Sequence, residues 1–247
     1  MAFLGELTAG IAHELQNPLN FMKNFADVST GLVDDMGGGT RSGSAGLEGE
    51  ILAGLKQNLR EISQHGQRAT SIIKGMLEHS RAGTGQRLPT PLNELVEDSL
   101  RLAYQSLRAK DKSFNAHLTT TLDPALPPVA VVPQDLGRVL INLLTNAFYA
   151  VRQRQQAGEL GYAPTVRVST QQVGEKIEIR VSDNGTGMPD NIKARIFQPF
   201  FTTKPVGEGT GLGLSLSHDI VTTGHGGTLV VESHEGQGTE FIISLPA

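Results

Sequence analysis

Apolar positions divide the chain into two parts with different periodicity. From Met1 to about Met36, large apolar residues recur every three or four positions, which predicts a long amphipathic helix. A Gly/Ser-rich break at 37–46 follows, and a second segment of helical period runs from about Leu47 to Ser80. Two long helices joined by a short connection predict an antiparallel hairpin.

A hairpin of this length cannot bury both of its apolar stripes by itself. Pairing with a second copy buries them in a four-helix bundle, so we expect a homodimer built from two hairpins. The alternative is that the hairpin packs against the second half of the same chain.

From about residue 92 onward, helical and alternating patterns are mixed. The stretch RAGTGQRLPTP at 81–91 is typical of a linker. The pattern predicts helices at about 92–107, 134–155 and 189–197 and from about 212, and strands at 114–122, 129–132, 165–171, 175–182, 227–233 and 239–245. We therefore expect an α+β chain, with a helical hairpin at 1–82, a linker at 83–91 and an α/β sandwich with a mixed sheet at 92–247.

Composition excludes several classes of protein. Of the 247 residues, 38% are hydrophobic and 19% charged, which is typical of a chain with a packed core. The net charge of −4 and the lack of a basic stripe argue against nucleic acid as a partner. The absence of cysteine excludes disulfides, thiol catalysis and cysteine-bound zinc. No apolar run is long enough to span a bilayer, and Glu6 interrupts any signal peptide, so we expect a cytoplasmic segment.

His13 lies about 160° from the centre of the apolar stripe of its helix, which predicts a solvent-facing side chain. Glu14 follows directly, and Asn17 lies one turn further on the same side. Pro18 is expected to kink the helix, because it provides no N–H for the carbonyl of Glu14. A neutral imidazole is a competent nucleophile when a carboxylate takes the proton from its other nitrogen. The other histidines have no spacing typical of metal ligands, and we interpret them as surface or loop residues: His65, His79, His117, His218, His225 and His234.

Two segments of the second half combine amides and a carboxylate with glycine. Asn142 and Asn146 are four residues apart in LGRVLINLLTNAFYAV at 136–151, so their carboxamides share a helix face and can bind magnesium. In DNGTGMP at 183–189, Asp183 ends a predicted strand and offers a buried carboxylate to an exocyclic amine. Gly185 and Gly187 would let a planar base approach the backbone.

Two further segments complete the second half. IFQPFFTTK at 196–204 joins an aromatic cluster to a polar loop, and its phenylalanines are interpreted as packing residues. GEGTGLGLS at 207–215 is a glycine run that opens a helix, where backbone N–H groups favour phosphate. It lacks the Lys-Ser or Lys-Thr ending of a P-loop and the context of a dinucleotide fingerprint.

These motifs together resemble a known family. The run ELTAGIAHELQNPLN at 6–20 resembles the phosphoacceptor box of sensor histidine kinases. The four segments of the second half resemble, in order and spacing, the nucleotide-binding domain shared by histidine kinases, DNA gyrase, a heat-shock chaperone family and mismatch-repair ATPases. The resemblance implies autophosphorylation of a histidine by ATP with Mg²⁺, followed by transfer to an aspartate in the receiver domain of a response regulator.

The resemblance also assigns roles to residues. It implies that His13 is phosphorylated, that Glu14 is the general base and that Asn17 serves a phosphatase activity. Asn146 is implied as the principal magnesium ligand with Asn142 beside it, and Asp183 as the residue that recognises adenine. Further nucleotide-binding positions by resemblance are the base-lining glycines, the ATP lid at 202–209, the glycines after it and a residue supporting the adenine pocket: Gly185, Gly187, Thr202, Thr203, Lys204, Gly209, Gly211, Leu212, Gly213 and Thr239.

The chain departs from the family pattern at two positions. Gln16 stands where many members have Arg or Lys, and we expect this to alter partner contacts rather than chemistry. Tyr149 stands where many kinases have a basic residue three positions after the magnesium ligand. The triphosphate would then depend more on magnesium, on the glycine backbone and on Lys204 or Arg152.

Two other functions compete with the kinase. An ATPase that drives conformational change, as in the gyrase and chaperone relatives, leaves the His13–Glu14–Asn17–Pro18 face without a purpose. A catalytically silent module that dimerises and binds a regulator leaves the nucleotide motifs without one. His13 lies close to the start of this sequence, so we also expect sensory parts upstream, and any attachment to a membrane would be through those parts. The hand of the connection at 37–46 would decide whether the phosphate comes from the same chain or its partner.

Overall fold

The computed structural model of the chain describes the backbone in four stretches, at 2–38, 45–81, 85–205 and 208–247. Side chains are described at 15–34, 49–73, 85–205 and 208–247. The chain divides into two compact units, of which one comprises Met1–Ser80 and Thr202–Leu212 and the other Arg81–Phe201 and Gly213–Ala247.

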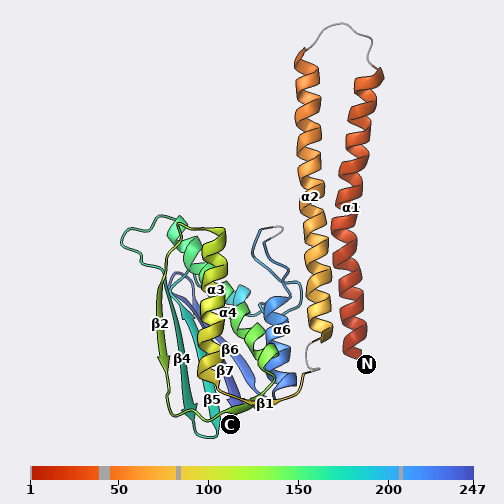
Figure 1. Ribbon diagram of the computed structural model, residues 1–247. Helices are drawn as coiled ribbons and strands as arrows, with labels where there is room; N and C mark the ends of the chain where they lie inside the picture. Colours follow the sequence, from red (N-terminus) through yellow and green to blue (C-terminus); the bar gives the residue numbers. More distant parts are fainter. Residues whose placement is uncertain (1, 39–44, 82–84, 206–207) are drawn as a thin grey trace. The chain divides into compact units, whose positions relative to one another are not determined.

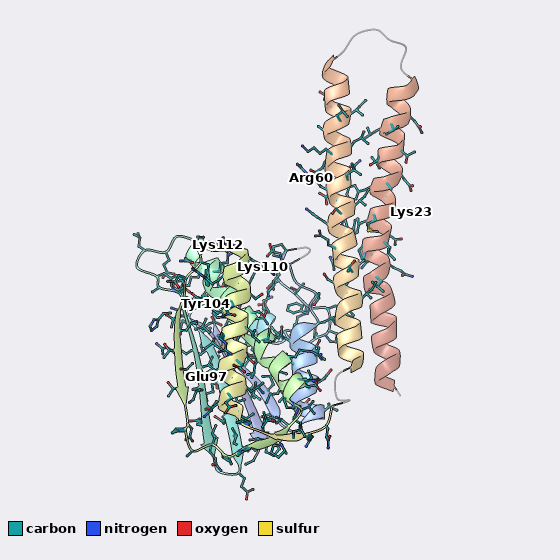
Figure 2. The ribbon with its side chains drawn as sticks, in the orientation of Figure 1. Lys23, Arg60, Glu97, Tyr104, Lys110 and Lys112 are labelled. Carbon is teal, nitrogen blue, oxygen red and sulfur yellow. The ribbon has the colours of Figure 1, made fainter. Side chains whose placement is uncertain are left out.

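The first unit contains the predicted helical hairpin. Helix α1 (Ala2–Gly38) and helix α2 (Ala45–Arg81) run side by side in opposite directions (Figure 1). Small residues allow them to approach, since a Cβ on Gly66 would lie 3.5 Å from the sulfur of Met22. The ring of Phe21 stacks on that of His65, with centroids 4.8 Å apart. Charged side chains such as Lys23 and Arg60 lie exposed along the helices (Figure 2).

Two features of α1 bear on the predicted phosphoacceptor box. The helical backbone continues through Pro18, which is buried, so the proline does not end the helix. The backbone of His13 and Glu14 is helical, but their side chains lie outside the described residues, so the exposure of His13 stays a prediction.

The second unit is a five-stranded mixed sheet with helices on one face (Figure 1). Its strand order is β2-β4-β5-β7-β6, in which β2 is parallel to β4 and the other pairs are antiparallel. The strands are β2 (His117–Leu122), β4 (Thr165–Val173), β5 (Lys176–Asp183), β6 (Thr228–His234) and β7 (Gly238–Pro246). The helices are α3 (Leu92–Lys110), α4 (Pro133–Gln156), α5 (Asp190–Lys193) and α6 (Gly213–Asp219), followed by the π-helical turn η1 (Ile220–Gly224). The predicted fold class, a helical hairpin followed by an α/β domain with a mixed sheet, is confirmed.

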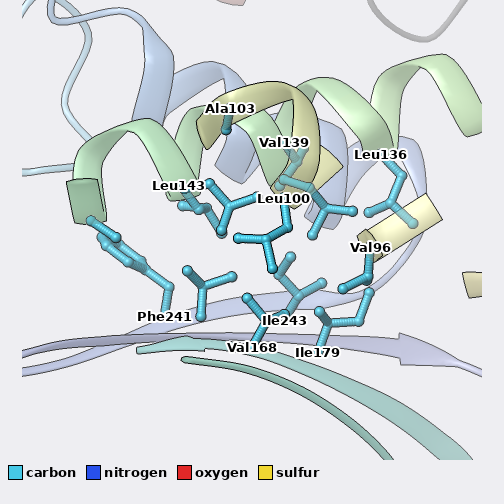
Figure 3. Close-up of a cluster of buried hydrophobic side chains, with 14 of the residues drawn as sticks. Val96, Leu100, Ala103, Leu136, Val139, Leu143, Val168, Ile179, Phe241 and Ile243 are labelled. Atoms are coloured by element: carbon cyan, nitrogen blue, oxygen red, sulfur yellow. The ribbon is translucent and has the colours of Figure 1, made fainter. Parts of the chain in front are cut away.

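The core of this unit lies between the helices and the inner face of the sheet. Strands β5 and β7 alternate between buried apolar residues on the inner face and polar residues such as Glu178 and Glu240 on the outer face. Helix α4 packs on β4, β5 and β7. Figure 3 shows the side chains that meet there, among them Val96, Leu100, Leu136, Val139, Leu143, Val168, Ile179, Phe241 and Ile243.

Some elements differ from the prediction. The predicted linker contains a strand, β1 (Leu88–Thr90), which pairs with β3 (Val129–Val131) in a separate two-stranded sheet. Three residues are too short for an alternation to be seen in the sequence. The helix predicted at 189–197 is reduced to the four residues of α5, after which the backbone continues in turns.

His225 lies in the turn after η1, as a loop residue would, but it is buried and not on the surface. It is 3% exposed, and Val132 donates its N–H to Nε2 of His225 at 2.9 Å. The other ring nitrogen, Nδ1, lies 2.8 Å from the carbonyl oxygen of Ile220, which can only accept. The ring is therefore a neutral tautomer that joins the end of η1 to the start of α4. Within the part of the chain that the structure describes, no helix has the length and apolar character needed to cross a membrane.

Candidate active site

A row of buried polar residues crosses three strands where the inner face of the sheet ends. Asp183 on β5 is the register partner of Thr239 on β7, and Thr239 is the partner of Ser233 on β6. The next row on the same face is apolar and consists of Val181, Phe241 and Val231. Side chains in register on one face lie about 5 Å apart, so Asp183, Thr239 and Ser233 form one polar group under the helices.

Asp183 is the central acceptor of this row. Gly185 donates its N–H to Oδ1 of Asp183 at 2.8 Å, and the backbone N–H of Thr239 also donates to this carboxyl. Burial outweighs these two hydrogen bonds and raises the pKa of Asp183 from 3.8 to about 7. The buried carboxylate predicted at this position is confirmed. A ligand that donates a hydrogen bond to the carboxylate would offset the cost of its burial.

The glycines after Asp183 are required by the packing of the chain itself. A Cβ on Gly185 would lie 2.6 Å from Cβ of Ala150 on α4 and 2.8 Å from Oδ1 of Asp183. Gly187 has a φ of +63°, and a Cβ there would collide with the carbonyl group of His234. The turn between β6 and β7 thus lies directly against the loop after β5. The approach of a base to both glycines stays a prediction, and the contact between these loops is a separate reason for glycine at these positions.

An arginine that the sequence analysis did not single out holds the outer side of the same loop. Arg154, near the end of α4, donates from Nη1 to the carbonyl oxygens of Asn184 at 2.9 Å and of Gly185 at 3.3 Å. Its other nitrogens form a two-pronged ion pair with Glu159, with distances of 2.6 and 3.0 Å. Its guanidinium carbon lies 4.8 Å from the centre of the Tyr162 ring.

Tyr162 and Asn184 complete this support. The Tyr162 hydroxyl donates to Oδ1 of Asn184 at 3.0 Å, and Thr165 donates its N–H to the same oxygen at 2.8 Å. Burial raises the pKa of Tyr162 to about 12, so the hydroxyl keeps its proton and remains a donor. The loop after β5 is therefore held by α4 and by the segment before β4. Asn184 of the Asp-Asn-Gly sequence indicates a turn, but its partners Tyr162 and Thr165 are distant in the chain and could not be predicted from the sequence.

Asn142 and Asn146 lie one turn apart on α4, with partly buried side chains. Asn142 donates from Nδ2 to the Ser217 hydroxyl at 2.9 Å, and Ser217 donates to the carbonyl of Gly213 at 2.9 Å. Oδ1 of Asn142 then faces Gly213, and a Cβ on that glycine would collide with it. The structure therefore brings Asn142 together with the first residue of α6. Carboxamide oxygens are suitable ligands for Mg²⁺, so the donors on this face of α4 fit such an ion.

Two candidates for a cation near the triphosphate differ in their surroundings. Arg152 is engaged elsewhere, since it pairs with Asp111 at the end of α3 with an N–O distance of 3.0 Å. Hydrogen bonds from Ser113 and the charge of Arg152 hold the pKa of Asp111 below its ordinary value. Tyr149 accepts a hydrogen bond from Gln153 at 3.0 Å. Burial lowers the pKa of Lys204, and the charge of Glu208 opposes this shift.

In the described part of the segment at 202–212, Thr202 lies close to Lys204 and Gly209. Lys204 donates its N–H to Oγ1 of Thr202 at 3.1 Å, and a Cβ on Gly209 would lie 2.6 Å from that oxygen. Thr202 and Thr203 are exposed, and Gly211 has a φ of +69°. Phe200, just before the segment, has a φ of +65°, a strained conformation for a residue with a side chain. Residues 206 and 207 of the predicted lid lie outside the described residues.

Comparison with known proteins decides the family. Residues 3–85 match the His Kinase A (phospho-acceptor) domain, and residues 131–247 match the family described as histidine kinase-, DNA gyrase B- and HSP90-like ATPase. The solved catalytic domain of histidine kinase ThkA is 30% identical, with a TM-score of 0.50, and the match covers 93% of that domain and 63% of this chain. The chain belongs to the histidine kinase family. Its second unit is an ATPase-type domain.

Two further relatives show how much of a histidine kinase the chain represents. The sensor histidine kinase ZraS of Escherichia coli K12 is 32% identical over 243 residues, which are 98% of this chain and 45% of ZraS. The chain thus spans about half the length of this curated relative. ThkA in complex with the response regulator TrrA matches 99% of this chain and 62% of that one, at 26% identity and a TM-score of 0.63.

Proposed function

We propose that this chain transfers the γ-phosphate of ATP to His13 and then to an aspartate of a response regulator. One observation carries the proposal: a buried polar row suited to an amine-bearing base lies in an ATPase-type domain that follows a helix with the box His-Glu-x-x-Asn-Pro. The complex of the related ThkA with a response regulator supports the partner.

The nucleotide would be held by residues of the second unit and the segment that interrupts it. Asp183 and Thr239 accept hydrogen bonds from the adenine edge, over the loop that contains Gly185 and Gly187. Asn146 and Asn142 would hold Mg²⁺, which would neutralise phosphate charge when bound. By resemblance to the family, the triphosphate would be bound by residues at 202–204 and by the glycine run, namely Thr202, Thr203, Lys204, Gly209, Gly211, Leu212 and Gly213.

The transfer to His13 needs little beyond position and charge neutralisation. A ring nitrogen attacks the γ-phosphorus in line, so the N–P bond forms as the bond to the bridging β-oxygen breaks and ADP leaves. Glu14 takes the proton from the other nitrogen, which keeps the ring a good nucleophile. Asn17, partly buried one turn further along α1, would position a water for removal of phosphate from the regulator.

The hairpin supports a homodimer. Large hydrophobic side chains between 47% and 62% exposed lie along both helices, namely Leu19, Phe21, Val28, Val33, Leu52, Leu59 and Ile73. Exposed apolar surface of this extent marks an interaction site, and a second hairpin offers matching residues. We infer that the regulator docks on the same hairpin, near Gln16 to Asn24, and that this segment works in the cytoplasm, where ATP is available.

Phosphotransfer in two stages tests the function. The chain is incubated with γ-labelled ATP and Mg²⁺, freed of nucleotide, and mixed with each member of a panel of receiver domains in fresh Mg²⁺. We expect acid-labile, base-stable label on the chain, no label when EDTA is present from the start, and rapid movement of label to at least one receiver. Release of labelled phosphate from ATP without labelled protein would favour the conformational ATPase, and no ATP binding would favour the silent module.

Arg154 supports the loop after Asp183, so its replacement tests the nucleotide pocket without removing a group that contacts the nucleotide. An Arg154→Gln variant loses the charged donors to Asn184 and Gly185, so the loop after Asp183 is held less firmly. We expect its Kd for ATP to rise about tenfold, the value of one charge-assisted hydrogen bond, with a smaller change in the rate at saturating ATP.

Titration calorimetry measures this Kd, and matched variants control the result. Arg101→Gln removes an exposed arginine that pairs with Asp98 on α3, and it should bind ATP like the wild type. Arg154→Lys retains one charged donor, so its Kd for ATP should lie between those of the wild type and Arg154→Gln. An unchanged Kd in Arg154→Gln would contradict the role assigned to Arg154.

A further inference from the structure

Ser233 is the member of the buried polar row that neither the sequence analysis nor the proposed function uses. It is 3% exposed, while Thr239 and Asp183 beside it are 7% and 8% exposed. The neighbouring inward-facing positions on β6 and β7 are apolar. They are the pairs Leu229 with Ile243 and Val231 with Phe241. A buried hydroxyl at the end of such a face needs hydrogen-bond partners.

The hydroxyl of Ser233 has three partners and only one hydrogen. Met188 donates its N–H to Oγ at 2.9 Å, and Oγ lies 3.0 Å from the carbonyl oxygen of Gly238. The third partner is the hydroxyl of Thr239, at 2.9 Å. A carbonyl can only accept, whereas a threonine hydroxyl can also donate. All partners are satisfied only if Ser233 donates to Gly238 and Thr239 donates to Ser233.

This direction leaves Thr239 without a hydrogen for any other group. The hydrogen bonds to Asp183 come from the backbone N–H groups of Gly185 and Thr239, not from the Thr239 hydroxyl. Two neighbouring acceptors therefore remain for a ligand, the Asp183 carboxylate and the Thr239 oxygen. A group with two hydrogens to donate satisfies both, and a carbonyl oxygen in its place would leave both buried acceptors unpaired.

We infer that Ser233 is a positioning residue that makes the Thr239 hydroxyl an acceptor beside Asp183, so that the site selects a base with an exocyclic amine. The inference rests on the proposed ATP function and adds Ser233, which sets the direction of the hydrogen bond between its hydroxyl and that of Thr239. Without Ser233, Thr239 would donate to Asp183 and occupy the acceptor that the amine needs.

Three nucleotides separate this role from a merely structural one. Titration calorimetry compares ATP, which carries the amine, with inosine triphosphate, which carries oxygen there, and purine riboside triphosphate, which carries hydrogen. The wild type should bind ATP most tightly. In Ser233→Ala, the affinity for ATP should fall about tenfold, while that for purine riboside triphosphate should change less than about twofold.

Two controls keep the outcome decisive. Ser233→Thr retains a hydroxyl and should recover most of the preference for ATP. Ser244→Ala removes a hydroxyl from the outer face of β7 and should leave all three affinities unchanged. If Ser233→Ala bound all three nucleotides equally more weakly, or kept the wild-type preference for ATP, the inference about Ser233 would be overturned while the proposed function would stand. A wild-type chain that binds none of them would overturn the proposed function and this inference with it.

Discussion

An Asp183→Asn variant should lose ATP binding and gain stability above pH 7. The asparagine amide donates where the adenine amine also donates, so the contact becomes repulsive. We expect the Kd for ATP to rise at least about a hundredfold, because a buried donor is left facing another donor. The same change removes a buried ionisable group. The variant therefore no longer loses stability when this group becomes charged, although its affinity for ATP falls.

The sign of the stability effect follows from the pKa of Asp183. Burial raises the pKa from 3.8 to about 7 in the folded chain. The stability that this carboxyl contributes is fully present below about pH 4 and is lost as the pH rises to about 7, by roughly 4 kcal/mol in the wild type. Asp183→Asn should lack this loss and should be more stable than the wild type at pH 8.

Thermal unfolding of both proteins between pH 4 and 8, with calorimetry for ATP, measures these effects. Asp98→Asn removes an exposed carboxylate from α3 and is the matched control, which should follow the wild type in both. The role given to Asp183 would be refuted by a variant that binds ATP normally. If the stability of Asp183→Asn fell between pH 4 and 7 as much as that of the wild type, the raised pKa of Asp183 would be refuted.

Replacing His13 with glutamine should remove the phosphoryl acceptor and leave the ATP site intact. We expect label from ATP on the chain to fall at least about a thousandfold, as removal of an essential nucleophile does in other enzymes. The Kd for ATP should stay within about twofold, because Asp183 and Asn146 lie in the other unit.

The rate of label incorporation and the calorimetric Kd together measure this prediction. His117→Gln changes an exposed histidine on β2 and should be labelled like the wild type. Glu14→Gln should slow labelling by about 10² to 10⁴, the usual contribution of a general base. Label on His13→Gln at the wild-type rate would mean that another residue is the acceptor.

Much of the fold could be predicted because its signals are local. The helical period of 1–36 and the alternation in β5 depend on neighbouring residues, and the structure confirms both elements. Asp183 was predictable as a buried carboxylate because it ends such a strand. The packing of Gly185 and Gly187 was not predictable, since the segments that contact them are distant in the sequence.

The features that sequence reasoning missed depend on contacts between distant segments. Ser233 belongs to the site only through the register of β6 on β7, and Arg154 only because the loop after β5 returns to the end of α4. His225 lies next to two glycines and resembles a turn, yet its ring is buried by residues of η1 and of the segment before α4. Single-sequence periodicity carries no information on such pairings.

The position of the phosphate on the protein tests the central claim most directly. The chain is phosphorylated with ATP and Mg²⁺, kept at alkaline pH and digested with trypsin, and its peptides are sequenced by mass spectrometry. The first lysine or arginine is Lys23, so the peptide 1–23 contains a single histidine, His13. We predict phosphate on His13 in this peptide, lost on treatment with acid. Phosphate on any other peptide, or ATP turnover with none on the chain, would contradict the account.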